Sequence, residues 1–153
     1  MYLSIIIPAY NENHKIRKDI HAACEFILAN DFSAEIIIVD DGSTDDTTQI
    51  AQQTTVPENV TKNVITLADN KGKGFAIGTG IKSSKGQIVM FADSGCCVPF
   101  ENAIQGIEMI RDNQCDIAHA SRKMTGCNIK KGQSLYRKTC SKMFRLFMIY
   151  YMK

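Results

Sequence analysis

Hydrophobic residues fall along the chain in short blocks whose spacing alternates between that of strands and that of helices. Runs of mostly β-branched residues at 3–7 and 36–39 each break off into polar residues, as strands buried on both faces of a parallel sheet do. Between them, residues 13–30 carry apolar side chains at the spacing of one helical stripe. A strand, a helix and a strand form a βαβ unit, whose crossover is expected to be right-handed. We therefore expect the polar ends of both strands at the carboxyl edge of one sheet, where open α/β folds bind ligands.

The alternation continues beyond this unit. It predicts helices at 44–53, 75–83 and 100–113, and strands at 63–67, 87–91 and 115–119. Because the order shows no repeat and no linker, it predicts an α/β fold, a three-layer α/β/α sandwich around a mainly parallel sheet. We expect a core at 1–122, followed at 123–153 by a basic loop and an amphipathic C-terminal helix of the same domain, where the chain could be truncated.

The composition is that of an ordinary globular protein, with 44% hydrophobic and 22% charged residues. No apolar run reaches the ~18–20 residues that a membrane-spanning helix needs, and we expect no signal peptide, because the first strand begins within three residues. Six cysteines without a CxxC pair argue against zinc and for reduced thiols. We therefore expect a cytoplasmic location.

Charge is distributed very unevenly along the chain. Residues 1–116 hold nine Lys and Arg and all sixteen Asp and Glu, whereas residues 117–153 hold nine Lys and Arg and no acid. Such a tail predicts an anionic partner. Residues 133–153 combine cations with an apolar helical stripe, which favours peripheral contact with a membrane; packing on the domain or in a homodimer is the alternative. We expect no nucleic-acid partner, because no aromatic platform or known module accompanies the basic residues.

Four polar motifs fall at the expected ligand-binding edge. They are Pro8-Ala9-Tyr10-Asn11-Glu12, Asp40-Asp41-Gly42, Asn70-Lys71-Gly72-Lys73-Gly74 and Asp93-Ser94-Gly95. The carboxylates of Asp40 and Asp41 can accept hydrogen bonds from a base N–H or a ribose hydroxyl, although one of them could serve only the turn at Gly42. Lys71 and Lys73 stand beside a helix N-terminus, a combination that suits a diphosphate.

These motifs, in this order, resemble a known family. The stretches IIIPAYNE, IIIVDDGSTDDT, NKGKGFA and FAD are similar to the N-terminal, nucleotide-binding half of the inverting family 2 glycosyltransferases, which have the GT-A fold. The likeness covers about residues 3–122 and is greatest to the branch that makes dolichyl- or polyprenyl-phosphate sugars. It implies a divalent metal, Mg²⁺ or Mn²⁺, on Asp93. The nucleotide-binding residues that it implies are Pro8, Ala9, Tyr10, Glu12, Asp40, Asp41, Lys71 and Lys73.

The sequence departs from the family pattern at two places. The family has a second carboxylate two residues after the first, and Gly95 stands at that position, which weakens the expected metal site. Family members that deprotonate an acceptor hydroxyl carry a further acid downstream, but no acid follows Asp116 here. A lipid phosphate is already ionised and needs no such base, so the missing acid favours a phosphate acceptor. The resemblance implies that Asp93 and Arg122 are catalytic and that Arg122 and Arg137 bind the acceptor phosphate.

The function that follows is transfer of a hexose, with inversion, from a UDP- or GDP-sugar to polyprenyl or dolichyl phosphate at the cytoplasmic membrane face. Two alternatives remain open. The first is a family 2 enzyme that acts on a saccharide or a cell-surface glycan. The second is a non-catalytic nucleotide- or membrane-binding remnant, which Gly95 and the short chain suggest.

Overall fold

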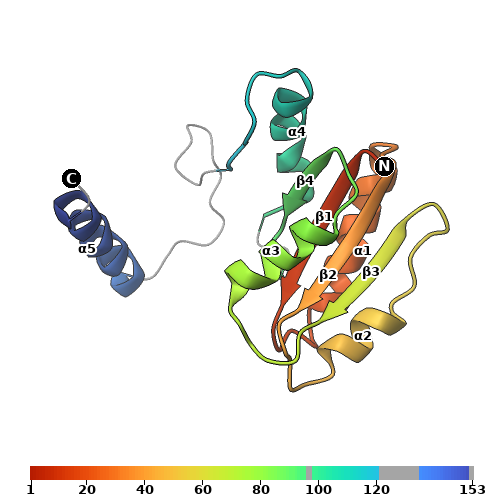
Figure 1. Cartoon of the computed structure of the whole chain (residues 1–153), viewed down its shortest axis with the longest axis horizontal. Helices are drawn as coiled ribbons and strands as arrows, with labels where there is room; N and C mark the ends of the chain where they lie inside the picture. Colours follow the sequence, from red (N-terminus) through yellow and green to blue (C-terminus); the bar gives the residue numbers. More distant parts are fainter. Residues whose placement is uncertain (96–97, 121–134, 152–153) are drawn as a thin grey trace. The chain divides into compact units, whose positions relative to one another are not determined.

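The computed structural model describes residues 1–95, 98–120 and 135–151. The chain divides into two compact units, residues 1–120 and residues 121–153, and each is described by itself (Figure 1). The first unit holds a parallel sheet with helices on both faces. Its elements in chain order are β1 Leu3–Ala9, α1 Ile16–Ala29, β2 Ala34–Asp40, α2 Thr47–Gln53, β3 Thr61–Thr66, α3 Lys73–Ser83, β4 Ile88–Phe91, the 3₁₀ turn η1 Phe100–Ala103 and α4 Ile104–Arg111.

The sheet has the strand order β3-β2-β1-β4, and every neighbouring pair is parallel. Leu3 of β1 lies opposite Ala34 of β2, and Ala9 opposite Asp40, so both strands end at the same edge. This register confirms the expected βαβ unit. It brings the loops after β1, β2 and β4 to the carboxyl edge of one sheet, as parallel connections require.

The two faces of the sheet are covered by different helices, which confirms the three-layer α/β/α sandwich (Figure 1). On one face Leu3, Ile5 and Ile7 of β1 join the core that α1 supplies. On the other face Ile6 packs with Ala76 of α3. α3 approaches closely because Gly80 faces β1, where an added Cβ would lie 2.6 Å from the Ile6 side chain. Both faces of β1 and β2 are therefore buried, which is why their central residues, 5–7 and 36–39, are apolar.

The strand expected at 115–119 is wrong, because residues 115–120 form no strand. The one large aliphatic side chain of this segment, Ile117, is 84% exposed. Its neighbours Asp116 and His119 are polar, so burying the segment beside the sheet would remove little apolar area from water. The helix expected at 100–113 is present, but it begins with the 3₁₀ turn η1 after Pro99 and continues as α4.

The second unit contains α5, Leu135–Tyr151, within the range expected to be helical. Several of its large apolar side chains are exposed within this unit, namely Met143, Phe144, Leu146, Phe147, Ile149, Tyr150 and Tyr151. Among the residues that the structure describes, no helix has the length and the apolar character needed to span a membrane.

Candidate functional site

A pocket of about 330 Å³ lies at the carboxyl edge of the sheet. Its walls come from the end of β1, from the loops after β1, β2, β3 and β4, and from the start of α3. The lining residues are Pro8, Ala9, Tyr10, Glu12, Asp41, Asn70, Gly72, Lys73, Ala76, Asp93 and Ser94. The structure thus brings together residues from all four polar motifs, although they are spread over more than half of the sequence.

Asp40 and Asp41 are adjacent in sequence but occupy different environments. Asp40 is fully buried, accepts hydrogen bonds from the hydroxyls of Ser43 and Thr48, and is not part of the pocket wall. Asp41 lies on the pocket wall. Asp40 is therefore the member of the pair that supports the turn, an alternative that the sequence left open.

Asp41 also connects two of the loops around the pocket. Its Oδ1 accepts a hydrogen bond from the Lys71 backbone N–H at 2.9 Å, and its Oδ2 accepts one from the Gly72 N–H at 2.8 Å. A carboxylate has lone pairs for about four hydrogen bonds, so two remain for a ligand. Asp41 can therefore hold the 71–72 turn and accept from a bound molecule at the same time.

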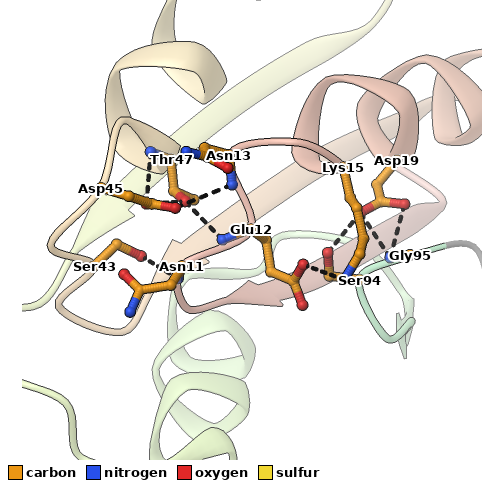
Figure 2. Close-up of polar contacts among 10 residues, drawn as sticks. All are labelled: Asn11, Glu12, Asn13, Lys15, Asp19, Ser43, Asp45, Thr47, Ser94 and Gly95. Atoms are coloured by element: carbon orange, nitrogen blue, oxygen red, sulfur yellow. Dashed lines mark hydrogen bonds and ion pairs between the residues drawn. The ribbon is translucent and has the colours of Figure 1, made fainter.

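The loop after β1 is attached to the loop after β2 by a row of hydrogen bonds, which Figure 2 shows. The Asn11 N–H donates to Ser43 Oγ at 2.9 Å, and the Glu12 N–H donates to Thr47 Oγ1 at 2.8 Å. The Asn13 N–H donates to the Asp45 carboxylate at 3.3 Å. The sequence pattern did not predict these contacts. Their signal is the polar run after Gly42, which supplies acceptors opposite the first loop.

Asp45 titrates differently from an ordinary carboxyl group. Burial acts to raise the pKa of Asp45, but hydrogen bonds from the Thr47 side chain and backbone and from the Asn13 N–H favour the ionised form. The net effect lowers the pKa of Asp45 below its usual 3.8. The attachment between the two loops is therefore made by an ionised carboxylate.

Tyr10 and Glu12, both expected at the nucleotide, line the pocket. Tyr10 is 45% exposed, so its ring is available for stacking. Glu12 forms an ion pair with Lys15, with Nζ 2.6 Å from Oε2. Pro8 and Ala9 complete this wall at the end of β1.

The two lysines of the glycine-rich turn differ in position. Lys73 opens α3, lines the pocket and forms an ion pair with Asp93. The Lys71 side chain lies over the ring of Phe75, 5.0 Å from its centroid, and Lys71 is not part of the pocket wall. Ala76, which also lines the pocket, was not anticipated, although it lies three residues after Lys73 and hence on the same helix face.

Asp93 is the carboxylate from the loop after β4 that faces the pocket. Its side chain is 55% exposed, and the side chain of its partner Lys73 is 54% exposed. Within the described residues there is no cluster of three or more His, Cys, Asp or Glu placed to hold a metal. Mg²⁺ is commonly held by one or two carboxylates, with phosphate and water completing its shell. The residues present therefore fit a divalent cation that takes most of its ligands from a bound diphosphate.

The structure does not test the two arginines expected at the acceptor. Arg122 lies outside the described residues. Arg137 lies in α5, and its side chain is outside the described part of that helix. Both assignments remain predictions.

Residues 4–152 match the family described as "Glycosyl transferase family 2". Dolichyl-phosphate beta-glucosyltransferase from Homo sapiens is 34% identical over 131 residues, which cover 78% of this chain and 40% of the relative. The protein of the same name from Dictyostelium discoideum is 33% identical, with coverage of 80% and 40%. The chain thus spans about 40% of the length of these curated relatives.

Solved structures show the same similarity. Staphylococcus aureus TarS 1–349 in complex with UDP-GlcNAc has a TM-score of 0.60 at 27% identity, covering 74% of this chain and 32% of the TarS chain. The Pyrobaculum calidifontis mannosyltransferase PcManGT, in complex with GDP-Man and Mn²⁺, has a TM-score of 0.55 at 25% identity, covering 60% and 26%. These similarities, together with the parallel sheet and the pocket at its carboxyl edge, show that the chain belongs to glycosyltransferase family 2 and has the GT-A fold.

Proposed function

We propose that this chain is the donor-binding part of an inverting glycosyltransferase that transfers a hexose from a UDP- or GDP-sugar to a polyprenyl phosphate. The observation that carries the proposal is the convergence of Tyr10, Asp41, Lys73 and Asp93 on one pocket. The names of the relatives support a dolichyl-phosphate acceptor, and the complexes of TarS and PcManGT support a UDP- or GDP-linked donor.

Each side of the pocket suits one part of such a donor. Tyr10 offers an exposed ring for the base, and Asp41 retains free acceptor capacity for a base N–H or a ribose hydroxyl. Lys73 stands at the N-terminus of α3, where the helix has no side-chain cap and its first N–H groups favour an anion. The diphosphate would therefore lie between Lys73 and the loop after β4.

The ion pair between Lys73 and Asp93 suits a site that is rearranged when the donor binds. Because both side chains are more than half exposed, the pair contributes only about 0–1 kcal/mol. Lys73 can therefore leave Asp93 for the diphosphate at little cost. Asp93 would then hold a divalent cation, which supplies electrostatic stabilisation of the leaving diphosphate.

The acceptor would be an ionised phosphate, which needs no general base. One of its oxygens attacks the anomeric carbon of the sugar as the bond from that carbon to the diphosphate oxygen breaks, so the nucleoside diphosphate leaves and the configuration inverts. Arg122 and Arg137 are proposed to bind the acceptor phosphate. We further propose that α5 contacts the membrane at its cytoplasmic face, because the tail from 117 has nine cations and no acid.

Calorimetric titration with UDP and GDP, with and without Mn²⁺, tests the donor site directly. We expect one nucleotide to bind with about micromolar affinity, near −8 kcal/mol. Asp41→Asn should weaken binding both with and without Mn²⁺. Asp93→Ala should remove the additional affinity that Mn²⁺ provides.

Asp112→Asn is the matched control, because Asp112 is an exposed carboxylate at the end of α4, away from the pocket wall. It should bind as the unmodified chain does. A folded chain that binds neither nucleotide would refute the proposal. Binding by the chain without transfer to polyprenyl phosphate would favour the glycan-directed or non-catalytic alternatives.

A further inference from the structure

Asp19 is a buried carboxylate on α1 that the proposed function does not use. Its side chain belongs to the first turn of α1 and is only 2% exposed. It faces the loop after β4, more than 70 residues further along the sequence, as Figure 2 shows. A buried carboxyl group normally needs hydrogen-bond partners, and Ser94 and Gly95 both donate to this one.

The contacts of Asp19 fix two consecutive residues of that loop. Ser94 Oγ donates to Asp19 Oδ2 at 2.7 Å. The Gly95 N–H is shared between the two carboxylate oxygens, at 3.0 Å from Oδ1 and 2.9 Å from Oδ2. Gly95 has φ of 95°, a conformation that residues with a side chain rarely adopt. A glycine at this position lets the backbone N–H turn toward α1.

Asp93 lies directly between two anchored points. On its N-terminal side, the Ala92 N–H donates to the Ile6 carbonyl oxygen at 2.9 Å, which ties the chain to β1. On its C-terminal side, Ser94 and Gly95 are tied to α1 through Asp19. The exposed Asp93 side chain is therefore presented to the pocket by a backbone that is fixed before and after it.

We propose that Asp19 is a positioning residue that holds the 93–95 loop so that Asp93 can bind a divalent cation on the donor diphosphate. This inference rests on the proposed function for the role of Asp93. It also explains the glycine at position 95. Gly95 replaces the second carboxylate of the family pattern, but its N–H donates to Asp19 on α1, and this contact fixes the loop that carries Asp93. Asp19 acts through the loop and does not itself contact the ligand.

The matched control is Glu35, at the opposite edge of the sheet. Glu35 is 3% exposed and accepts a hydrogen bond from Ser4 Oγ at 2.6 Å and from the Lys85 N–H at 2.7 Å. It is thus a buried carboxylate that also holds one serine and one loop N–H, but far along β2 from the pocket. Asp19→Asn and Glu35→Gln each replace one carboxylate oxygen by an NH₂ donor, and therefore weaken comparable interactions at the two edges.

The first experiment measures how much Mn²⁺ strengthens nucleotide binding, by calorimetry with UDP and GDP on the whole chain. In Asp19→Asn this enhancement should fall about 10- to 100-fold, the usual effect of removing a residue that orients a metal ligand. The affinity without Mn²⁺ should stay within about twofold of the unmodified chain, because Tyr10 and Asp41 are untouched. Glu35→Gln should keep the full enhancement. Ser94→Ala removes the contact from Ser94 Oγ to Asp19 and should reduce the Mn²⁺ enhancement by less. The double variant Asp19→Asn/Ser94→Ala should lose no more of the enhancement than Asp19→Asn alone.

The second experiment needs no ligand. Hydrogen exchange followed by NMR should show the Gly95 amide protected in the unmodified chain and exposed in Asp19→Asn, with protection in the sheet retained.

The outcomes separate the two proposals. If the unmodified chain binds no nucleotide, both fail. If it binds nucleotide with no Mn²⁺ enhancement, or if Asp19→Asn keeps the enhancement, the role of Asp19 is refuted while donor binding stands. Equal loss of the Mn²⁺ enhancement in Asp19→Asn and Glu35→Gln would also overturn it, since a general loss of stability would then explain the effect. An unprotected Gly95 amide in the unmodified chain would overturn it as well, because Asp19 would then not hold the loop.

Discussion

Gly42, in the turn after β2, provides the sharpest test of how the site is held. Its φ is 72°, and a Cβ at this position would lie 2.6 Å from the Asp69 carbonyl carbon and 2.8 Å from the Asn70 nitrogen. Both of those atoms belong to the backbone, so neither can rotate away. Residues 69–70 lead into the turn whose N–H groups hold Asp41. Gly42→Ala therefore disturbs the fold and the pocket together.

The magnitude follows from two costs and one gain. A residue with a side chain in the left-handed region costs about 1–2 kcal/mol, and overpacking against fixed atoms costs about 1–3 kcal/mol. Reduced freedom of the unfolded chain returns about 0.4–1 kcal/mol. We expect Gly42→Ala to lower the free energy of unfolding by about 2–4 kcal/mol, a large part of the ~5–15 kcal/mol typical of a domain.

Urea unfolding of three variants measures this effect. Gly78→Ala is the control: it lies inside α3 with nothing within 4 Å of its added Cβ, so it should stabilise the protein by about 0.5–1 kcal/mol. Gly42→Asn keeps the steric conflict but tolerates the left-handed backbone better, so it should be less harmful than Gly42→Ala. If Gly42→Ala unfolds at the same urea concentration as the unmodified protein, the close approach of the two turns is refuted.

Three further predictions concern charge. Lys73→Ala should weaken binding of UDP or GDP while leaving the weak binding of the corresponding nucleoside unchanged, because only the diphosphate would contact the lysine; calorimetry with both ligands checks this. The pKa of Asp45 is lowered, so its stabilising effect is complete above the unfolded value of about 3.8 and is lost as the pH falls through the lower folded value. Asp45→Asn should therefore reduce stability at neutral pH and flatten its loss in acid, as measured by thermal unfolding between pH 2 and 7. The full chain should sediment with anionic vesicles and be released by salt, whereas a chain ending at Gly132 should not bind; equal sedimentation of both would exclude α5 as the contact.

The sequence predicted β1 and β2 well because Ile5–Ile7 and Ile36–Val39 are apolar on both faces and stop at polar residues. The carboxyl edge followed from the parallel topology, and with it the grouping of Tyr10, Asp41 and Asp93. The short strand expected at 115–119 failed, because one isoleucine between polar residues does not determine whether a segment joins a sheet.

Other features of the site could not be predicted from the sequence. Asp40 and Asp41 are the same residue type and both are buried, and only the direction of each side chain at the strand end decides that Asp41 lines the pocket and Asp40 does not. Asp19 reads in sequence as a polar residue near a helix start, since its donors lie more than 70 residues away. Contacts of this separation depend on tertiary packing rather than on local pattern.

The row of hydrogen bonds between the first two loops has a consequence for folding kinetics. It joins residues 32 to 35 positions apart, close to the separation of 31 between Leu3 and its β2 partner Ala34. Pairing of β1 with β4 instead joins Leu3 to Ile88, a separation of 85 residues, and closing that longer loop costs about 0.9 kcal/mol more. We expect the loops that carry Tyr10 and Asp41 to be in place in the folding transition state, and the loop that carries Asp93 to dock afterwards. Ile36→Val should then slow refolding, while Ile88→Val should mainly accelerate unfolding.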